Sequence, residues 1–225
     1  MSKKKLARFA ENLTFANLFQ HTQFDMTKEK FPLWGKWRHN YFHNDNPIVL
    51  ELGCGKGEYT VALAQRMPDK NYIGIDRKGA RLWRGCKDAL ELQLFNVAFI
   101  RTQIAQIEYY FAENEVDEIW VTFPDPQPKK EWHRLVSPNY VHSYYKKILK
   151  PEAIIHLKTD SRMLYEYLLK EITAEKWQLI TNIEDVYKTD DKLLTEIQTF
   201  YEKHWLDSSE TISYIAFQLM KTESI

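Results

Sequence analysis

The sequence contains little cysteine, little glycine and no excess of either charge. Its two cysteines, Cys54 and Cys86, are too few for a disulfide-stabilised scaffold or for a zinc site built from cysteines. No apolar run reaches the roughly 18 residues that a membrane span needs, and no apolar signal segment follows the basic start at residues 1–5. These absences predict a cytoplasmic protein with no membrane partner and no metal site.

The lack of net charge hides an uneven distribution. Lys and Arg together number 31, as do Asp and Glu, and this balance argues against a strongly cationic nucleic-acid binder. Residues 1–38, however, hold eight basic and three acidic residues, whereas residues 175–225 hold five basic and ten acidic ones. Such unevenness can arise by chance, but a local basic patch is enough to contact a nucleic acid. We therefore divide the chain into a basic N-terminal extension, 1–38, and a main domain, 39–225.

Short apolar segments alternate with helical patterns from residue 48 onwards. The expected strands are Ile48–Leu52, Tyr72–Asp76, Val97–Arg101, Glu118–Phe123 and Ala153–Lys158. The expected helices are Glu58–Arg66, Lys78–Phe95, Tyr140–Leu149 and Ser161–Ala174. The strands lack a clean alternation of apolar and polar residues, which is typical of parallel strands covered by helices on both faces. The pattern predicts an α/β fold with a doubly wound, Rossmann-like sheet.

The end of the chain departs from this alternation. Trp177–Ile180 and Ile212–Met220 have the composition of strands, and the stretch from Leu193 to Trp205 has a helical pattern. We expect the two strands to form a final antiparallel hairpin, so that a mostly parallel sheet ends in an antiparallel strand.

Three of the seven glycines fall in the short segment Glu51–Gly57, between an expected strand and an expected helix. Glycines such as Gly53 and Gly55 allow a tight turn and a close approach of a ligand to the backbone. The spacing departs from the dinucleotide fingerprint at Glu58, and no phosphate-binding G-K-[ST] follows. By itself, this cluster is equally compatible with a purely structural turn.

Acidic residues narrow the choice of ligand. Glu51 lies at the mouth of the glycine loop, where a carboxylate repels phosphate but accepts from an ammonium group. Asp76 ends the next strand, where an acid binds the hydroxyl groups of a ribose. A ligand with a ribose, a cationic amino-acid end and no phosphate is S-adenosylmethionine. Gln103, after the third strand, is placed to accept from the adenine amine, although a solvated helix start explains it equally well.

A second loop combines proline with charge. Pro124, Pro126 and Pro128 stand at alternate positions and predict a stiff, extended loop after the strand at 118–123. Asp125 is held between the first two, beyond the carboxyl end of a strand, where ligands bind in open α/β sheets. The basic residues that follow, which offer phosphate contacts, are Lys129, Lys130, His133 and Arg134. The alternative is a surface connection with solvated charges, but an acidic tip beside a basic cluster is unusual in such a loop.

The segment Phe123–Lys130 resembles the signature of the bacterial tRNA (guanine-N7-)-methyltransferases, a family of class I S-adenosylmethionine-dependent methyltransferases. The resemblance covers roughly residues 30–220, with the order and spacing of the motifs kept. The other matching segments are Glu51–Gly57, Tyr72–Asp76, Ile155–Asp160 and Thr199–Glu202. It implies a seven-stranded class I methyltransferase sheet.

The resemblance also implies a reaction, the transfer of a methyl group from S-adenosylmethionine to N7 of a variable-loop guanosine, conventionally position 46, in tRNA. Asp125 is then the catalytic residue. Together with the glycine loop, the cofactor side comprises Glu51, Gly53, Gly55, Asp76, Gln103 and Asp125. The guanosine side comprises Lys129, Asp160, Thr199, Phe200, Tyr201 and Glu202.

Several of these residues have a structural alternative. Asp160 precedes an expected helix and has the composition of an N-cap. Thr199 and Glu202 are three residues apart, a spacing that also occurs on the solvent-facing side of a helix. The arginines that form one face of the helix after Asp76 fit tRNA contact or plain solvation; they are Arg77, Arg81 and Arg84.

The sequence departs from the family pattern at two site positions, because Gln127 replaces the usual tryptophan of the proline loop and Gln103 stands where aspartate is common. Other hypotheses are a class I methyltransferase acting on another RNA, a small molecule or a protein, and a tRNA-binding protein without catalysis. The sequence is compatible with a monomer or a homodimer.

Overall fold

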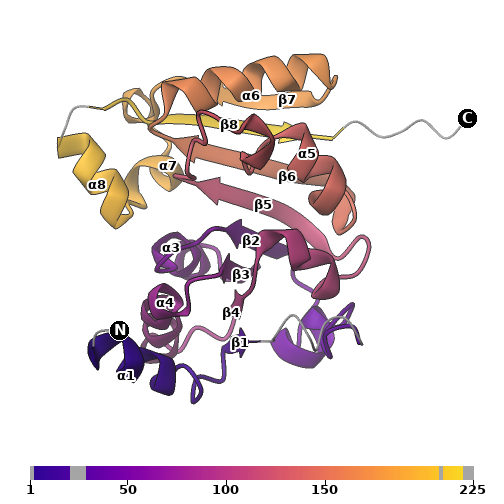
Figure 1. Cartoon of the computed structure of the whole chain (residues 1–225), viewed down its shortest axis with the longest axis vertical. Coiled ribbons are helices and arrows are strands. Elements are labelled where there is room, and N and C mark those ends of the chain that lie inside the picture. Colours follow the sequence, from indigo (N-terminus) through magenta and orange to yellow (C-terminus); the bar gives the residue numbers. More distant parts are fainter. Residues whose placement is uncertain (1–2, 21–28, 208–209, 220–225) are drawn as a thin grey trace, which may run out of the picture. The chain divides into compact units, whose positions relative to one another are not determined.

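The computed structural model describes residues 3–20, 29–207 and 210–219, without the side chains of a few of them, Phe200 and Tyr201 included. The chain forms two compact units, residues 1–112 and 113–225 (Figure 1). Among the described residues each unit contains four strands. No described helix is both long and apolar enough to cross a membrane.

The strands of the first unit are β1 (Leu18–Gln20), β2 (Ile48–Leu52), β3 (Asn71–Asp76) and β4 (Val97–Arg101). They lie in the order β1-β4-β3-β2, and each neighbouring pair is parallel. Tyr72 of β3 lies opposite Val49 of β2 on one side and Val97 of β4 on the other. Nearly every residue of β2, β3 and β4 is buried, as expected of strands covered on both faces. Because the strands are parallel, the carboxyl ends of β2, β3 and β4 lie at the same end of the sheet.

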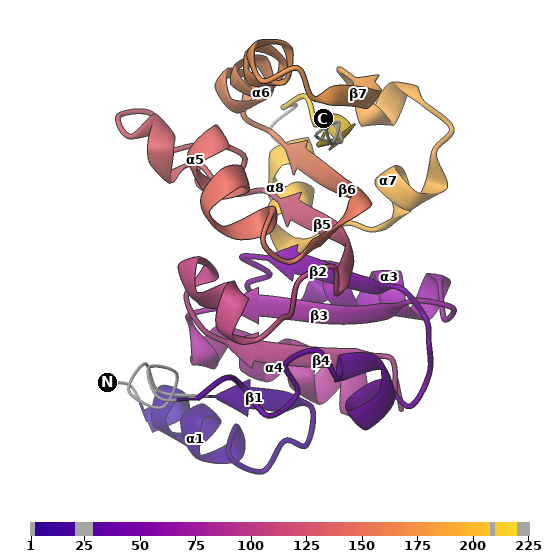
Figure 2. The same ribbon diagram turned by 90° about the vertical axis from the view of Figure 1, so that its right-hand side faces the viewer.

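Helices cover both faces of this sheet. α3 (Glu58–Arg66) and α4 (Gly79–Glu91) lie along one face, and η1 (Trp37–Phe42) lies on the other (Figures 1 and 2). The predicted helix to residue 95 is too long, because Gln93 has a left-handed φ of 54° and Leu94 N donates to Ala89 O at 2.9 Å. A left-handed residue and a hydrogen bond back to the last turn together form a common C-terminal motif of α-helices. A short helix, η2 (Ile104–Tyr109), follows β4.

The described part of the predicted N-terminal extension belongs to the first unit, where it packs against β4 and α4. β1 adds a parallel edge strand that no sequence signal predicted. α1 (Lys3–Glu11) contacts α4, since the side-chain amide of Asn12 donates to Gly79 O at 2.8 Å and the Trp83 indole donates to Glu11 at 2.6 Å. The guanidinium of Arg8 lies 4.6 Å from the centre of the Trp83 ring. Part of the basic charge of this segment is therefore held against α4.

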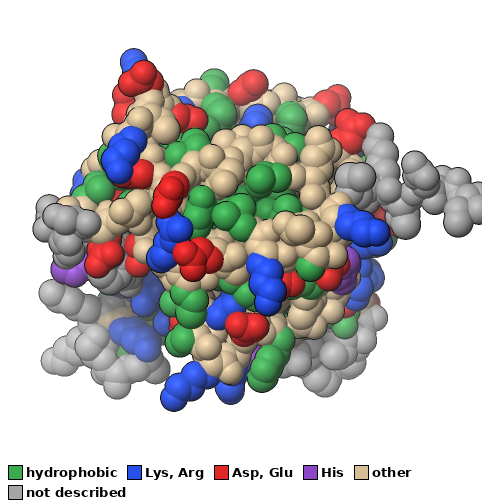
Figure 3. All heavy atoms as spheres, turned by 90° about the horizontal axis from the view of Figure 1, so that it is seen from above, with side chains coloured by type: hydrophobic (Ala, Val, Ile, Leu, Met, Phe, Trp, Pro, Cys, Tyr) green, Lys and Arg blue, Asp and Glu red, His purple; other side chains and the backbone are tan. Residues whose placement is uncertain are grey.

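The strands of the second unit are β5 (Val116–Thr122), β6 (Leu149–Thr159), β7 (Gln178–Ile183) and β8 (Ser213–Gln218), in the order β5-β6-β8-β7. β5 and β6 are parallel, and β8 is antiparallel to both β6 and β7. The α/β class with an antiparallel C-terminal strand is thus confirmed. The expected count of seven strands is one too few, because β1 was not predicted. β7 is an edge strand that exposes Leu179 and Ile180, and Figure 3 shows apolar side chains gathered on this end of the unit.

The connections of the second unit differ from the prediction. β7 and β8 are paired but do not form a hairpin, because residues 184–212 between them carry η5 (Val186–Lys188), α7 (Lys192–Glu196) and α8 (Phe200–Asp207). The predicted helix 193–205 is divided, since Ile197 has extended backbone angles. The predicted helix 140–149 is a short α5 (Pro138–Tyr140) and a π-helical turn, η4 (Val141–Tyr145). α6 (Arg162–Ala174) lies close to its predicted bounds.

Candidate active site

The glycine loop between β2 and α3 depends on backbone angles that favour glycine. Gly53, Gly55 and Gly57 have φ values of 76°, 59° and 73°. The amides of Gly53 and Cys54 both donate to Ile75 O of β3, at 2.8 and 3.1 Å. A Cβ added at Gly55 would meet no atom closer than 4.0 Å, so this part of the loop faces open space. The loop is therefore a cradle that a ligand can approach closely.

Glu51 supports the start of α3. Its side chain is only 3% exposed, and its Oε2 accepts from Thr60 N at 2.8 Å and from the Thr60 hydroxyl. The carboxylate thus lies at the positive end of the helix dipole. Burial raises the pKa of the neighbouring Cys54 thiol, and the Glu51 charge adds to that shift. Cys54 is accordingly a buried thiol rather than a nucleophile.

Asp76 closes the glycine loop from the end of β3. Its Oδ2 accepts from Gly55 N at 3.0 Å and its Oδ1 accepts from Lys78 N at 2.7 Å. Each carboxylate oxygen has a further lone pair, so the half-buried side chain is able to accept from a ligand hydroxyl as well. Gln103 is exposed at the start of η2 and does not cap that helix with its side chain.

Packing behind the loop involves residues that no motif identified. The ring of Phe99 on β4 lies beside glycines of three elements, Gly57 of the loop, Gly74 of β3 and Gly85 of α4. A Cβ added at Gly85 would lie 2.6 Å from Lys56 O and 3.1 Å from the Cα of Gly57. Gly85 therefore lets α4 contact the loop backbone directly. The available signal was an isolated glycine within a helical pattern, which often has a packing reason.

The proline loop of the second unit presents Asp125 at the surface. Asp125 is exposed, and its Oδ1 accepts from Gln127 N at 3.1 Å, so the side chain closes a local turn. Phe123 and Gln127, on either side, both have a φ of 46°. The loop is thus more sharply turned than the extended form predicted from its prolines.

The basic residues after this loop divide into two kinds. Lys129, Lys130 and His133 are exposed. Arg134, in contrast, is 2% exposed; it donates to Pro126 O at 3.0 Å and lies 4.1 Å from the centre of the Tyr167 ring. The prediction that Arg134 offers a phosphate contact is therefore wrong, because its guanidinium holds the loop in place.

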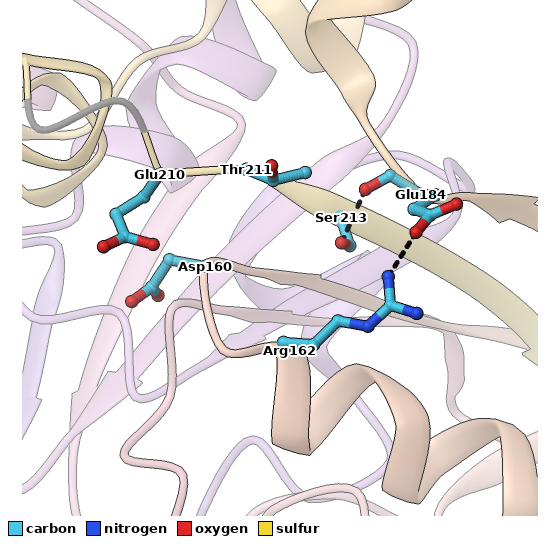
Figure 4. Close-up of a pocket in the computed structure, with 6 residues that line it drawn as sticks. All are labelled: Asp160, Arg162, Glu184, Glu210, Thr211 and Ser213. Atoms are coloured by element: carbon cyan, nitrogen blue, oxygen red, sulfur yellow. Dashed lines mark hydrogen bonds and ion pairs between the residues drawn. The ribbon is translucent and has the colours of Figure 1, made fainter.

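Asp160 lines a pocket at the carboxyl end of β6 (Figure 4). The pocket has a volume of about 260 Å³, and its lining residues are Asp160, Arg162, Glu184, Glu210, Thr211 and Ser213. Arg162 pairs with Glu184, whereas burial, with an added contribution from Glu210, raises the pKa of Asp160. The helix N-cap is Ser161, whose hydroxyl accepts from Leu164 N at 3.3 Å. Asp160 is thus not the cap, and its carboxylate is available to the pocket.

Thr199 and Glu202 are buried, in contrast to the solvent-facing alternative. The Thr199 hydroxyl accepts from Glu202 N at 3.2 Å at the start of α8. The carboxylate of Glu202 lies 2.6 Å from Nζ of Lys158 on β6, and both side chains are fully buried. Phe200 and Tyr201, the other predicted residues of this motif, have side chains outside the described part. Within the described ranges, no His, Cys, Asp and Glu side chains form a group of three or more that could hold a metal ion.

The predicted site residues therefore form separate groups. In the first unit, Asp76 bonds directly to the loop that holds Gly53 and Gly55, with Glu51 buried behind it. In the second unit, Asp125 and Lys129 share the proline loop, and Asp160 lines its own pocket. Thr199 and Glu202 pack around the start of α8.

Comparison with known proteins identifies the family. A model described as a putative methyltransferase matches residues 45–214. A tRNA (guanine-N(7)-)-methyltransferase of Christiangramia forsetii is 53% identical over 222 residues, covering 97% of this chain and 99% of that one. Proteins of the same name from Bacteroides thetaiotaomicron and Cytophaga hutchinsonii are 46% and 40% identical, covering 97% and 98% of this chain and 87% and 99% of theirs. The chain belongs to the tRNA (guanine-N(7)-)-methyltransferase family.

Solved structures agree with the fold expected for this family. A 16S rRNA methyltransferase, KamB, superimposes with a TM-score of 0.61 at 14% identity, over 78% of this chain and 88% of that one. A 30S ribosomal A1408 methyltransferase from an uncultured bacterium has a TM-score of 0.60 at 18% identity, over 80% and 91%. These similarities show the class I methyltransferase fold.

The cofactor of this methyltransferase family is S-adenosylmethionine. The glycine loop fits it, because the open space at Gly55 would admit a ligand where a Cβ would otherwise point. Asp76 has lone pairs left for ribose hydroxyls, as described above. The cofactor of the family is thus the ligand that the acidic residues around the glycine loop predicted from the sequence.

Proposed function

We propose that this protein transfers a methyl group from S-adenosylmethionine to N7 of the guanosine at position 46, in the variable loop of tRNA. The observation that carries the proposal is the 53% identity, over nearly the whole of both chains, to a relative named tRNA (guanine-N(7)-)-methyltransferase. The partners are the cofactor and tRNA. The location is the cytoplasm, a reducing compartment that suits the free cysteines Cys54 and Cys86.

The cofactor is held by the first unit. The backbone of Gly53 and Gly55 faces it, Asp76 accepts from its ribose hydroxyls, and Glu51 provides negative charge near its ammonium group. Gln103 is exposed after β4, where it is placed to accept from the adenine amine. When bound, S-adenosylmethionine supplies a methyl group on a positively charged sulfur.

Asp125 is the catalytic residue in this proposal. Guanine N7 has an in-plane lone pair and no proton, so the enzyme needs no base to activate it. The new bond forms at N7 while the methyl–sulfur bond breaks, and the sulfur keeps the bonding electrons. The guanine ring becomes positively charged, and a carboxylate aimed at it stabilises that charge as it develops. Correct alignment of N7 contributes the rest of the rate increase.

Asp160 is the residue that we assign to guanine recognition. The N1–H and N2–H₂ groups of guanine are hydrogen-bond donors that a carboxylate accepts, whereas N1 of adenine is an acceptor. Asp160 lines an open pocket, and the Glu210 charge beside it favours a donor-rich ligand (Figure 4). Lys129 is exposed beside Asp125 and is placed to contact the phosphate of the substrate nucleotide.

The test is to incubate the protein with an unmodified tRNA transcript and methyl-labelled S-adenosylmethionine, and then to digest the RNA to nucleosides. We expect 7-methylguanosine as the labelled product. A transcript with adenosine at position 46 should incorporate no label, because adenine lacks the donors that the pocket reads. Label in another nucleoside would contradict the reaction, and unchanged label in the adenosine-46 transcript would contradict the position.

The exposed lysines of the proline loop should contribute salt-sensitive tRNA affinity. Replacing Lys129 and Lys130 with glutamine removes up to two phosphate contacts, so the logarithm of affinity should fall less steeply with the logarithm of salt concentration, by about 1 for each contact. The change should be the same for all tRNAs, since phosphate contacts carry no sequence information. Lys192→Gln, an exposed lysine of α7, is the matched control. If the salt dependence of tRNA affinity is the same in all variants, Lys129 and Lys130 do not contact tRNA phosphates.

A further inference from the structure

The guanidinium of Arg134 is a buried positive charge beside the proline loop. Its side chain is 2% exposed, its Nε donates to Pro126 O at 3.0 Å, and its Nη1 donates to Oε1 of Glu131 at 3.1 Å. Pro126 directly follows Asp125, so the first of these hydrogen bonds lies one residue from the proposed catalytic carboxylate. Apart from local turns, it is the one hydrogen bond that residues 124–129 form within the described part of the chain.

The composition of the loop makes this bond important. Three of the loop residues are prolines, which have no backbone N–H to donate. Arg134 itself is anchored outside the loop, because the next carbonyl, Leu135 O, accepts from the Tyr145 hydroxyl at 2.7 Å and Val136 is fully buried. The guanidinium is thus a fixed donor for a loop that has few donors of its own.

The same guanidinium also contacts α6. It lies 4.1 Å from the centre of the Tyr167 ring, and its Nη2 lies 3.7 Å from the sulfur of Met163. Met163 and Tyr167 are four residues apart, so both lie on one side of the first two turns of the helix. The helix begins two residues after Asp160. Arg134 therefore connects the proline loop with the helix that follows Asp160.

Arginine suits this double contact. Its planar group donates hydrogen bonds within the plane and stacks on an aromatic ring with its face, which the ammonium group of lysine does not do. A buried charge is costly, and Glu131, which provides the opposite charge, is largely exposed. An apolar side chain would fill the same space without that cost, but it would not donate to Pro126 O. The residue type thus agrees with a role in holding the loop.

We propose that Arg134 and Tyr167 are positioning residues, which hold the proline loop against α6 and thereby fix the place of Asp125. The inference rests on the proposed function, in which Asp125 stabilises the charge on the guanosine that Asp160 recognises. Neither Arg134 nor Tyr167 touches the substrate. They contribute to the rate because the carboxylate acts only from the correct position, and a displacement of about 1 Å can cost about a hundredfold in rate.

The first experiment is a double-mutant cycle of Asp125 and Arg134. Arg134→Met should lower the single-turnover rate with saturating tRNA by about tenfold to a hundredfold. In an Asp125→Ala background the same substitution should lower the rate by less than about threefold, because the carboxylate that Arg134 positions is already absent. A substitution that only destabilises the fold would lower both rates by the same factor. Lys170→Met, which removes an exposed lysine of α6, is the matched control and should keep the wild-type rate.

The second experiment tests the aromatic ring. Tyr167→Leu removes the face on which the guanidinium lies and should lower the rate by about tenfold, whereas Tyr167→Phe keeps that face and should stay within about threefold of the wild type. Both variants retain Arg134, so this pair also decides the question if Arg134→Met does not fold. The Kd for S-adenosylhomocysteine, measured by calorimetry, should stay within about twofold, because no described contact of Arg134 involves the glycine loop.

Tryptic cleavage after Lys129 and Lys130, identified by the masses of the fragments, reports on the loop without any tRNA. Both lysines are exposed, so the rate of cleavage depends on how easily the loop leaves its packed form. Arg134→Met and Tyr167→Leu should accelerate the cleavage by about tenfold, because each removes a contact of the buried charge. Tyr167→Phe and Lys170→Met should leave it unchanged.

Two results would overturn the inference. The first is an Arg134→Met substitution that lowers the rate by the same factor with and without the Asp125 carboxylate. The second is a Tyr167→Leu variant that matches Tyr167→Phe in both methylation and cleavage. If the wild-type protein forms no 7-methylguanosine, the proposed function fails, and the cleavage rates alone decide whether Arg134 and Tyr167 hold the loop.

Discussion

The Asp125→Ala variant should methylate tRNA with a kcat about two to three orders of magnitude below the wild type. The carboxylate is exposed at the tip of the proline loop, where it is able to face the positive charge that develops on guanine. The KM for S-adenosylmethionine should change by less than about threefold, because Asp76, not Asp125, holds the glycine loop that we propose for the cofactor. Single-turnover kinetics with saturating tRNA separate the chemical step from product release.

Asp125→Asn is the control that separates charge from loop geometry. The Asn side-chain oxygen is still able to accept from Gln127 N, which in the wild type bonds to Asp125 Oδ1 at 3.1 Å. If charge is what matters, both variants should lose turnover to a similar degree. An asparagine variant that stays close to wild-type turnover would limit Asp125 to shaping the loop.

Local signals account for what could be predicted of the fold. The buried strands are short apolar runs, and the glycine loop needs left-handed backbone at Gly53, Gly55 and Gly57, so both leave a mark on adjacent residues. The residues of β1 carry no such local signal. A three-residue edge strand is specified by its pairing with β4, which is far away in the sequence.

Charged residues at the candidate site were harder to predict. A charge in a sequence indicates the surface, since burial of an unpaired charge is costly. Arg134 and Glu202 are buried nonetheless, because Glu131 and Lys158 provide the opposite charges and Pro126 O accepts from the Arg134 guanidinium. These partners come together only through the fold. The sequence therefore marked these loops as candidates but could not tell which of their charged side chains are exposed and which are buried.

The second large expected effect is the loss of cofactor affinity when Gly85 is replaced. The variant Gly85→Ala should bind S-adenosylhomocysteine about tenfold or more weakly, because overpacking a tight contact costs roughly 1–3 kcal/mol. The added Cβ would lie 2.6 Å from Lys56 O and 3.1 Å from the Cα of Gly57, which are backbone atoms of the glycine loop. The chain must relieve this contact by moving either α4 or the loop, and either shift alters the cradle at Gly55.

Gly79→Ala is the matched control for this variant. Gly79 lies on the same helix, but a Cβ there would be 2.9 Å from side-chain atoms of Arg101 and Phe9 rather than from backbone. Both substitutions replace a glycine of α4 by alanine, so the difference in cofactor affinity between them reports mainly the backbone contact made only at Gly85. Calorimetry should show weak cofactor binding in Gly85→Ala and near-wild-type binding in Gly79→Ala. Equal affinities, with only the melting temperature of Gly85→Ala lowered, would mean that the loop keeps its shape when α4 is displaced.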